Sequence, residues 1–199
     1  LSTPRLLDAY RHGIFPWPFA RGEPLPWVSP DPRAILPLEG MAVSRRLRRR
    51  LNQGQLLPTA DRAFRQVIAG WATEPDRRDH TWLFPEMIDA YTRMHREGHA
   101  HSVEVWQAGR LVGGVYGVAV GGCFCAESMF YRVRDASKAA LYYLVEHLRC
   151  RGYVLLDIQQ WTPHTGNLGA VEISRDEYLA RLAEAREMPV TFGSMGLGC

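Results

Sequence analysis

The sequence predicts a mixed α/β fold, on three observations. Residues 101–130 alternate with the period of strands, and Ala108-Gly109 and Gly121-Gly122 stand where hairpin turns belong. Segments before and after this meander carry helix start and stop signals. An apolar strand opens at Tyr153, after a long amphipathic helix. Helices, an antiparallel meander, a helix, a strand and a last helix therefore follow one another, as in a mixed α/β layer.

Length and composition are those of an ordinary soluble protein. The chain has 199 residues, of which 46% are hydrophobic and 23% charged, enough for one core or for a core with a small lobe. No apolar run approaches the roughly 18 residues that a membrane helix needs, and no export signal opens the chain. The four cysteines form no disulfide framework, so we expect a reduced, cytoplasmic protein without membrane contact.

Residues 1–57 are predicted to form a small N-terminal domain. A first helix is capped at Ser2 or Thr3 and stops at Gly13. Residues 14–40 are rich in proline and aromatic side chains, which predicts an ordered loop without a regular element.

An arginine-rich helix follows this loop. Five arginines occupy the six positions 45–50, and Leu47 and Leu51 are spaced to form one apolar ridge. The plain interpretation is a solvated helix face. The alternative is a contact with phosphates, because such a patch supplies the sequence-independent attraction for nucleic acids.

Residues 58–199 are predicted to form the larger domain. Asp61 is expected to cap a helix that runs through Trp71, and a second helix extends from Pro85 to Gly98. The three-strand meander comes next.

The long helix after the meander starts at Asp135 or Ser137, and a capping box at Ser174 opens the last helix. This order of elements resembles that of GCN5-related acyltransferases. Residues 132–140, however, lack the glycine-rich loop that would hold the pyrophosphate of coenzyme A.

The strand that opens at Tyr153 ends in polar side chains. Asp157 and Gln159 stand two residues apart, so both point to the same side of the strand. They lie where open α/β sheets place ligands, beyond the carboxyl end of a strand. A glutamine there can hold a carbonyl or an amine, and an aspartate can hold a cationic amine or orient the glutamine. The structural alternative is that both side chains cap loop amides.

Glu127 is unusual for a core strand. Alternation places it on one face with Cys123, Cys125 and Met129, unless a bulge intervenes. Either it pairs with an arginine, or it accepts hydrogen bonds from a ligand.

Two other kinds of site find less support. His95, His99 and His101 lie close together with Cys123 and Cys125 downstream, but their spacing is not that of a usual zinc site, so no metal is expected.

A covalent nucleophile is the second such possibility. Cys125 or Ser128 could act with a histidine, but no motif such as GxSxG surrounds either residue.

Ten motifs closely resemble, in order and spacing, the bacterial leucyl/phenylalanyl-tRNA–protein transferase family. They are GIFPW (13–17), WVSPDPR (27–33), VSRRL (43–47), HTWL (80–83), GHAHSVEVW (98–106), LVGGVYGV (111–118), FCAESMF (124–130), DASKAAL (135–141), LLDIQ (155–159) and HTGNLGAVEI (164–173). Each motif is weak alone, but ten in register are specific, and the resemblance runs to about Glu187.

The resemblance implies an aminoacyltransferase of the N-end rule. Such an enzyme moves leucine or phenylalanine, and also methionine, from aminoacyl-tRNA to the N-terminal Arg or Lys of an acceptor protein, which marks the acceptor for degradation. It also implies an acyltransferase-like domain behind a small N-terminal domain, a monomer, and no metal or other cofactor.

The resemblance also assigns roles to residues. Asp157 and Gln159 match the catalytic pair, in which Gln159 aligns the reacting groups while Asp157 orients it and attracts the acceptor amine. Glu127 matches the carboxylate beside the aminoacyl-adenosine, and Trp17 and Trp82 match the aromatic residues around the terminal adenosine. The pocket for the amino-acid side chain is expected to be lined by Val115, Leu144, Leu148 and Leu156. The acceptor stem of the tRNA is expected to contact Arg45, Arg46, Arg48, Arg49 and Arg50.

Two alternatives stand beside this interpretation. An acyl-CoA-dependent N-acyltransferase of the same fold would act without tRNA. A non-catalytic tRNA-binding module would bind tRNA without transfer, although the combination of Asp157, Gln159 and Glu127 argues against it. For the transferase, positioning can carry most of the rate, because an acceptor α-amine with a pKa of about 7.7–8.0 is partly neutral at pH 7.

Overall fold

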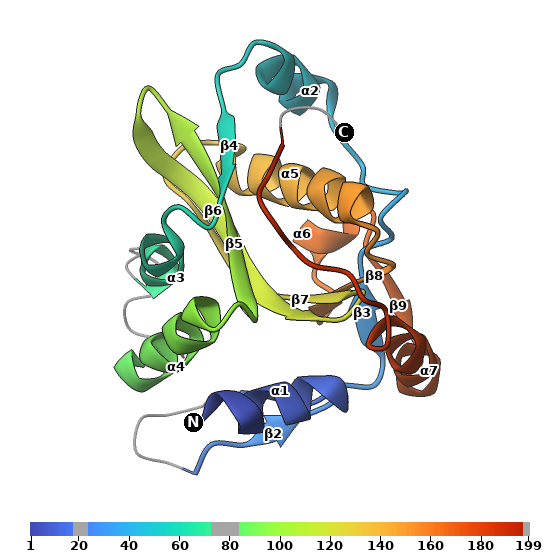
Figure 1. The fold of residues 1–199 in the computed structure, drawn as a ribbon. Coiled ribbons are helices and arrows are strands. Elements are labelled where there is room, and N and C mark those ends of the chain that lie inside the picture. The colour runs from blue at the N-terminus through green and yellow to red at the C-terminus, as the bar shows by residue number, and fades with distance from the viewer. Residues whose placement is uncertain (18–23, 73–83, 197–199) are drawn as a thin grey trace.

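A mixed sheet of seven strands forms the centre of the structure, a computed structural model that describes residues 1–17, 24–72 and 84–196 (Figure 1). In chain order the strands of this sheet are β3 (Arg33–Ile35), β4 (Leu57–Ala60), β5 (Ala100–Gln107), β6 (Arg110–Val120), β7 (Cys123–Tyr131), β8 (Leu155–Gln159) and β9 (Val171–Ile173). In space their order is β4-β5-β6-β7-β8-β3-β9. Neighbouring strands are antiparallel except β7 and β8, which are parallel.

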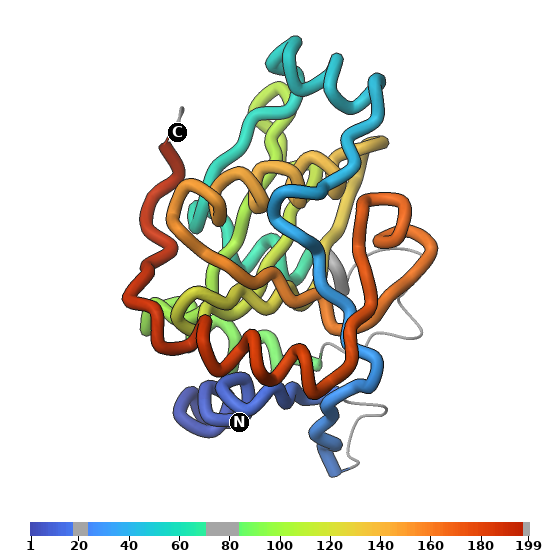
Figure 2. The backbone as a smooth tube through the Cα atoms, turned by 90° about the vertical axis from the view of Figure 1, so that its right-hand side faces the viewer, coloured from blue at the N-terminus to red at the C-terminus, as the bar shows by residue number. Residues whose placement is uncertain are grey.

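Helices cover both faces of the sheet (Figures 1 and 2). They are α1 (Thr3–Arg11), α2 (Arg45–Asn52), α3 (Phe64–Ala72), α4 (Pro85–Arg96), α5 (Ala136–Arg151), α6 (Pro163–Gly166) and α7 (Arg175–Ala185). None of these helices is long and apolar enough to cross a bilayer.

Two hydrophobic clusters occupy the two sides of the sheet. Side chains of α1, α3, α4 and α7 pack with Cys123, Cys125 and Leu155 in the first cluster. Side chains of α2 and α5 pack with Phe124 and Leu156 in the second. The alternation along β7 and β8 is the strand periodicity that assigns neighbouring residues to opposite faces.

The predicted order of elements is confirmed within the described part of the chain. β5, β6 and β7 form the antiparallel meander, and α5 leads from it into β8, the strand that ends in Asp157 and Gln159. Cys123 and Cys125 are buried with their sulfurs 3.8 Å apart, so they form no disulfide.

The prediction that residues 14–40 contain no regular element is wrong. β1 (Phe15–Pro16) pairs with β2 (Trp27–Val28), and β3 inserts between β8 and β9. Strands of two or three residues leave no periodic signal, and their partners are remote in sequence. Because β3 belongs to the central sheet, part of the expected N-terminal domain packs within the large one; the boundary at residue 57 stays a prediction.

The start of α3 also differs from expectation, because Asp61 does not cap it. Asp61 has a left-handed backbone with φ 58°, and its carboxylate accepts from the amide of Ser102 at 2.9 Å. The amides of Arg62 and Ala63 donate instead to the carboxylate of Glu104, at 3.3 and 3.2 Å. The cap of this helix therefore comes from β5, 40 residues or so further along the chain.

Replacing Glu104 by alanine should lower the free energy of unfolding by about 3 kcal/mol, because several buried donors lose their acceptor at once. Glu104 is fully buried and also accepts from the hydroxyls of Thr59 and Ser102. Urea unfolding would measure the change. Glu146 on α5, whose side chain is 45% exposed, is the control, and a Glu104→Ala loss no larger than that of Glu146→Ala would contradict the capping role.

Candidate active site

A buried ion pair holds the end of β8, the strand that carries Asp157 and Gln159. The guanidinium of Arg33 donates to both carboxylate oxygens of Asp157, at 2.9 and 2.6 Å, and the two side chains are 1% and 0% exposed. The hydroxyl of Tyr178 donates to the same carboxylate at 2.9 Å. Burial alone would lower the pKa of Arg33, but the hydrogen bonds and charge of Asp157 outweigh it and raise that pKa.

Asp157 also holds the backbone of Gln159. The amide of Gln159 donates to the Asp157 carboxylate at 2.8 Å, and Gln159 has a left-handed backbone with φ 68°. A left-handed conformation is unfavourable for a residue with a Cβ, so it persists because the surroundings impose it. The side chain of Gln159 then donates from Nε2 to Oε1 of Glu127 at 2.7 Å.

Glu127 lies in a β-bulge. Tyr116 pairs with Ser128 and Gly117 pairs with Ala126, so Glu127 is the extra residue of β7 at this point. The bulge breaks the alternation expected for this strand and turns the carboxylate toward Gln159.

Two buried tyrosines complete the environment of Glu127. The hydroxyl of Tyr91 donates to Oε2 of Glu127 at 3.1 Å, and it lies 2.6 Å from the hydroxyl of Tyr10. Burial raises the pKa of Glu127 to about 7, although the tyrosine hydrogen bonds act to lower it. Glu127 can therefore change its charge near neutral pH.

A cavity of about 520 Å³ opens onto Glu127 and Gln159. This volume suits a small organic group. One wall is apolar and consists of Val115, Ala126, Met129, Leu141 and Ile158. The remaining lining is polar apart from one aromatic side chain and consists of Trp17, Glu127, Ser128, Gln159, Gln160, Thr162, His164 and Thr165.

The arginine-rich helix α2 forms as predicted, with Ser44 as its cap and Leu47 buried. Arg46 donates to both carboxylate oxygens of Asp135, at 2.9 and 2.8 Å. Burial acts to raise the pKa of Asp135, but the hydrogen bonds and charge of Arg46 lower it below its usual value. Arg50 lies 3.7 Å from the same carboxylate and bonds to the carbonyl of Arg134.

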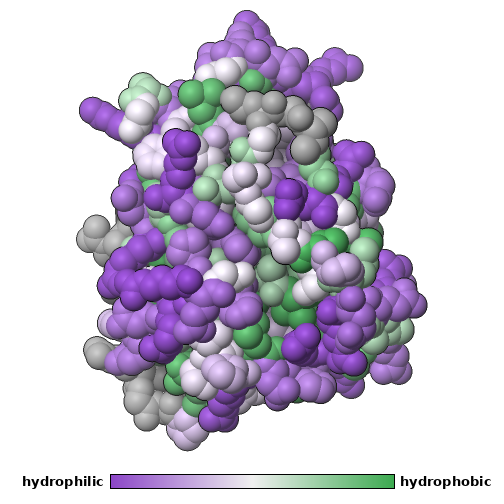
Figure 3. Space-filling model, in the orientation of Figure 1, coloured by the Kyte–Doolittle hydropathy of each residue, from purple (hydrophilic) through white to green (hydrophobic). Residues whose placement is uncertain are grey.

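The other three arginines of α2 point into solvent. Arg45, Arg48 and Arg49 are exposed and have no side-chain hydrogen bond or ion pair within the described residues. They contribute to the hydrophilic surface at the top of the molecule, over α2 (Figure 3). The structure therefore separates the arginines that hold α2 against α5 from those that are free to bind a ligand.

Asp61, His95 and His101 lie close enough to hold a metal ion, with their ligand atoms within 4.8 Å of one another. Nδ1 of His101 lies 2.7 Å from one carboxylate oxygen of Asp61. Nδ1 of His95 lies 3.7 Å from the other oxygen and 2.8 Å from the carbonyl oxygen of Ala100. These three residues do not line the cavity around Glu127. Neither His99, Cys123 nor Cys125 belongs to the cluster, so the grouping expected from the sequence differs.

Comparisons with known proteins identify the family of the chain. A family model described as leucyl/phenylalanyl-tRNA protein transferase matches residues 35–183, and the model of its N-terminal domain matches residues 1–31. The chain belongs to this family.

Relatives carry the same description over nearly the whole chain. The leucyl/phenylalanyl-tRNA–protein transferase of Pseudoalteromonas atlantica is 47% identical over 96% of this chain and 81% of its own. That of Chromohalobacter salexigens is 51% identical over 96% and 74%, and that of a Ruegeria species is 48% identical over 99% and 92%. Among solved structures, L-PGS from Bacillus licheniformis is 16% identical over 65% of this chain and 46% of its own, with a TM-score of 0.47.

Four of the residues expected to bind substrate or act in catalysis meet at the cavity around Glu127. Trp17, Val115, Glu127 and Gln159 line it, whereas Trp82 lies outside the described residues. Asp157 does not line the cavity. Three further expected lining residues, each at most 1% exposed, lie within the second hydrophobic cluster and not at the cavity surface: Leu144, Leu148 and Leu156.

Sequence reasoning missed Arg33, Tyr178 and Tyr91, which surround the predicted pair. Arg33 belongs to the WVSPDPR motif, and Tyr178 lies on the predicted last helix, so both stand in segments that the sequence singled out. No local pattern, however, names Asp157 as their common partner, because 124 and 21 residues separate them from it.

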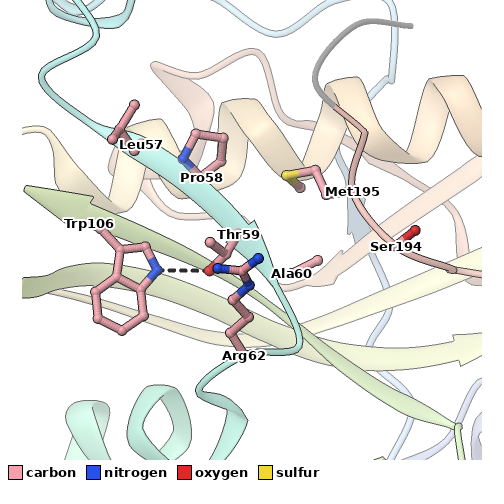
Figure 4. Close-up of a pocket in the computed structure, with 8 residues that line it drawn as sticks. All are labelled: Leu57, Pro58, Thr59, Ala60, Arg62, Trp106, Ser194 and Met195. Atoms are coloured by element: carbon pink, nitrogen blue, oxygen red, sulfur yellow. Dashed lines mark hydrogen bonds between the residues drawn. The ribbon is translucent and has the colours of Figure 1, made fainter. Parts of the chain in front are cut away.

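A larger hollow of about 750 Å³ lies elsewhere, along the edge strand β4 (Figure 4). The indole nitrogen of Trp106 donates there to the hydroxyl of Thr59 at 2.7 Å. Its described lining contains no carboxylate, histidine or cysteine and none of the expected site residues: Leu57, Pro58, Thr59, Ala60, Arg62, Trp106, Ser194 and Met195. The smaller cavity is therefore the better candidate for chemistry.

The raised pKa of Glu127 predicts a pH dependence of stability. Between the usual value near 4.5 and the folded value of about 7, the unfolded chain loses a proton that the folded chain keeps. Glu127 therefore lowers stability progressively as pH rises through this window. The free energy of unfolding of Glu127→Gln, measured in urea relative to wild type, should increase by up to about 3 kcal/mol between pH 4.5 and pH 8.

Glu146, whose side chain is 45% exposed, provides the control for this pH series. Glu146→Gln is unfolded in urea at the same pH values. A Glu127→Gln difference from wild type that changes with pH no more than that of Glu146→Gln would contradict the assigned pKa.

Proposed function

We propose that the chain transfers leucine or phenylalanine, and also methionine, from aminoacyl-tRNA to the N-terminal Arg or Lys of acceptor proteins. The observation that carries this proposal is one cavity, in a chain of this family, where an apolar wall meets the Gln159–Glu127 pair. The basic acceptor, degradation as its fate, a monomer and a cytoplasmic site of action belong to the proposal on the resemblance of the sequence.

The donor ester occupies the cavity in this proposal. Its apolar side chain lies against Val115, Met129 and Leu141, which form the edge of the second hydrophobic cluster that lines the cavity. The buried leucines predicted from the sequence belong to the same cluster but do not line the cavity. Trp17 offers a ring for the terminal adenosine, because stacking is how proteins hold an unpaired base.

In the reaction the acceptor nitrogen bonds to the ester carbonyl carbon, and the bond from that carbon to the ribose oxygen breaks. The ribose oxygen leaves as a hydroxyl after it takes up a proton that the amine has lost. The attacking amine must lose a proton, and Asp157 has no exposed surface from which to attract the amine or take that proton. Glu127 lines the cavity and has a pKa of about 7. We therefore assign two roles to its carboxylate, which binds the ammonium group of the acceptor and accepts the proton that this group loses. Nε2 of Gln159 donates to Glu127, so the side-chain carbonyl oxygen of Gln159 is the atom that can align the amine.

The acyl-CoA alternative is disfavoured by the start of α5. The position where a pyrophosphate loop would stand carries the carboxylate of Asp135, paired with Arg46. A pyrophosphate loop is glycine-rich, and residues 132–140 contain no glycine.

Wild-type protein should transfer labelled phenylalanine or leucine from charged tRNA to a peptide that begins with Arg, and not to one that begins with Gly or Asp. Gln159→Ala should lower kcat/KM by about 100-fold, because positioning of the amine is lost. Quantitation of labelled peptide measures both results. Acyl transfer from acyl-CoA without tRNA would contradict the proposal, and tRNA binding without transfer would assign a binding module.

The arginines of α2 should divide into two groups. Replacing Arg48 and Arg49 by alanine should weaken tRNA binding and reduce the slope of log affinity against log salt by about 1 per arginine, with stability unchanged. Arg46→Ala should lower the free energy of unfolding, because it leaves Asp135 with one partner fewer.

Filter binding over a salt series and urea unfolding separate these effects. Arg110→Ala, at the exposed β5–β6 turn, is the control for loss of one charge. An Arg48/Arg49 variant with the wild-type salt slope would remove α2 from the tRNA contact.

A further inference from the structure

Arg33 and Tyr178 join three separate parts of the chain at one buried carboxylate. Arg33 donates two hydrogen bonds to Asp157 and a third, at 3.0 Å, to the carbonyl of Gly13. Tyr178, on α7, accepts from Arg33 at 3.3 Å and donates to Asp157 at 2.9 Å. Every one of these bonds lies in the interior, where competition from water is absent.

Ring contacts hold the guanidinium in place as well. Its central carbon lies 4.9 Å from the ring centre of Phe15 and 4.3 Å from that of Tyr178. Gly13 makes this approach possible, because a Cβ there would lie 2.7 Å from Leu179 and 3.0 Å from the Tyr178 ring. The segment that carries Trp17 is thus fixed to the same cluster as the end of β8.

The backbone of Gln159 connects the cluster to the cavity. Asp157 has no exposed surface, but its Oδ1 accepts from the backbone amide of Gln159. That bond holds Gln159 in the left-handed conformation from which its side chain reaches Glu127. Movement of the Asp157 carboxylate therefore becomes movement of the Gln159 carboxamide.

We propose that Arg33 and Tyr178 are positioning residues for the transfer reaction, which hold Gln159 in register with Glu127 through the buried Asp157 carboxylate. The proposal rests on the proposed function and extends it to two residues that touch no substrate. Their contribution is to kcat, because they align reacting groups and contact neither the donor nor the acceptor.

Tyr178→Phe is the decisive variant, because it removes one hydroxyl and leaves the ring and the ion pair. We expect kcat for phenylalanine transfer to an Arg-initiated peptide to fall by about tenfold, with both KM values within about twofold of wild type. Arg33→Lys, which keeps the charge and loses the paired hydrogen bonds, should have a larger effect of the same kind.

Tyr143→Phe is the matched control. The hydroxyl of Tyr143 donates to the carbonyl of Leu56 at 2.8 Å, away from the cluster. Each phenylalanine variant loses one hydrogen bond that a tyrosine hydroxyl donates, and Tyr178→Phe also loses the acceptor of the weaker bond from Arg33. If Tyr178 had only a structural role, its loss would change the free energy of unfolding and kcat in parallel, as the loss at Tyr143 would. Wild-type kcat in Tyr178→Phe, or an equal loss in Tyr143→Phe, would overturn the proposal.

The side-chain amide of Gln159 gives a readout that does not depend on activity. Its proton–nitrogen NMR signal is identified by its absence in Gln159→Glu. The chemical shift of this signal should change in Tyr178→Phe and stay as in wild type in Tyr143→Phe. An unshifted signal in Tyr178→Phe would overturn the proposal. If wild-type protein transfers nothing, the proposed function fails, and this signal still shows whether Arg33 and Tyr178 hold Gln159.

Discussion

The buried pair of Arg33 and Asp157 is the interaction on which the rest of the structure depends. It links a short strand near the N-terminus, the end of β8 and the helix α7. Burying two charges is costly, and the pairing roughly offsets that cost, so net stabilisation is small. Removing one partner is different, because an unpaired buried charge costs about 3–5 kcal/mol. The pair therefore specifies which segments meet more than it adds to their stability.

Two backbone irregularities convert this fixed point into a site. Gln159 has a left-handed backbone at the end of β8, and Glu127 is the extra residue of a bulge in the neighbouring β7. Each departs from regular strand geometry, at about 1–3 kcal/mol for the left-handed residue. Together they bring an amide and a carboxylate 2.7 Å apart. Of the two acids, the sealed Asp157 acts on backbone geometry, whereas Glu127 faces the cavity and changes its charge near pH 7.

The hydrophobic core is continuous with the apolar wall of the cavity around Glu127. The second cluster runs from buried leucines of α5 and β8 to Val115 and Leu141 at the cavity surface. In the proposed function, selectivity for the donor side chain and packing of the core therefore depend on the same layer of side chains. The arginines of α2 divide in a similar way, since Arg46 and Arg50 secure the helix while three neighbours remain in solvent.

The sequence by itself determined the mixed α/β class, the meander, the long helix and the family, because periodicity, turn glycines and helix caps are local signals. It also singled out Asp157, Gln159 and Glu127, since polar residues in apolar strands are visible without a structure. Only the tertiary structure decided that Arg33 and Tyr178 form hydrogen bonds with Asp157. It also decided that Glu104 caps α3 in place of Asp61, and that β3 joins the sheet. These outcomes depend on partners from 21 to 140 residues away, the separations of Tyr178 from Asp157 and of Ile173 from Arg33. Burial excludes water, so such remote groups must satisfy one another, and no local pattern records which of them meet.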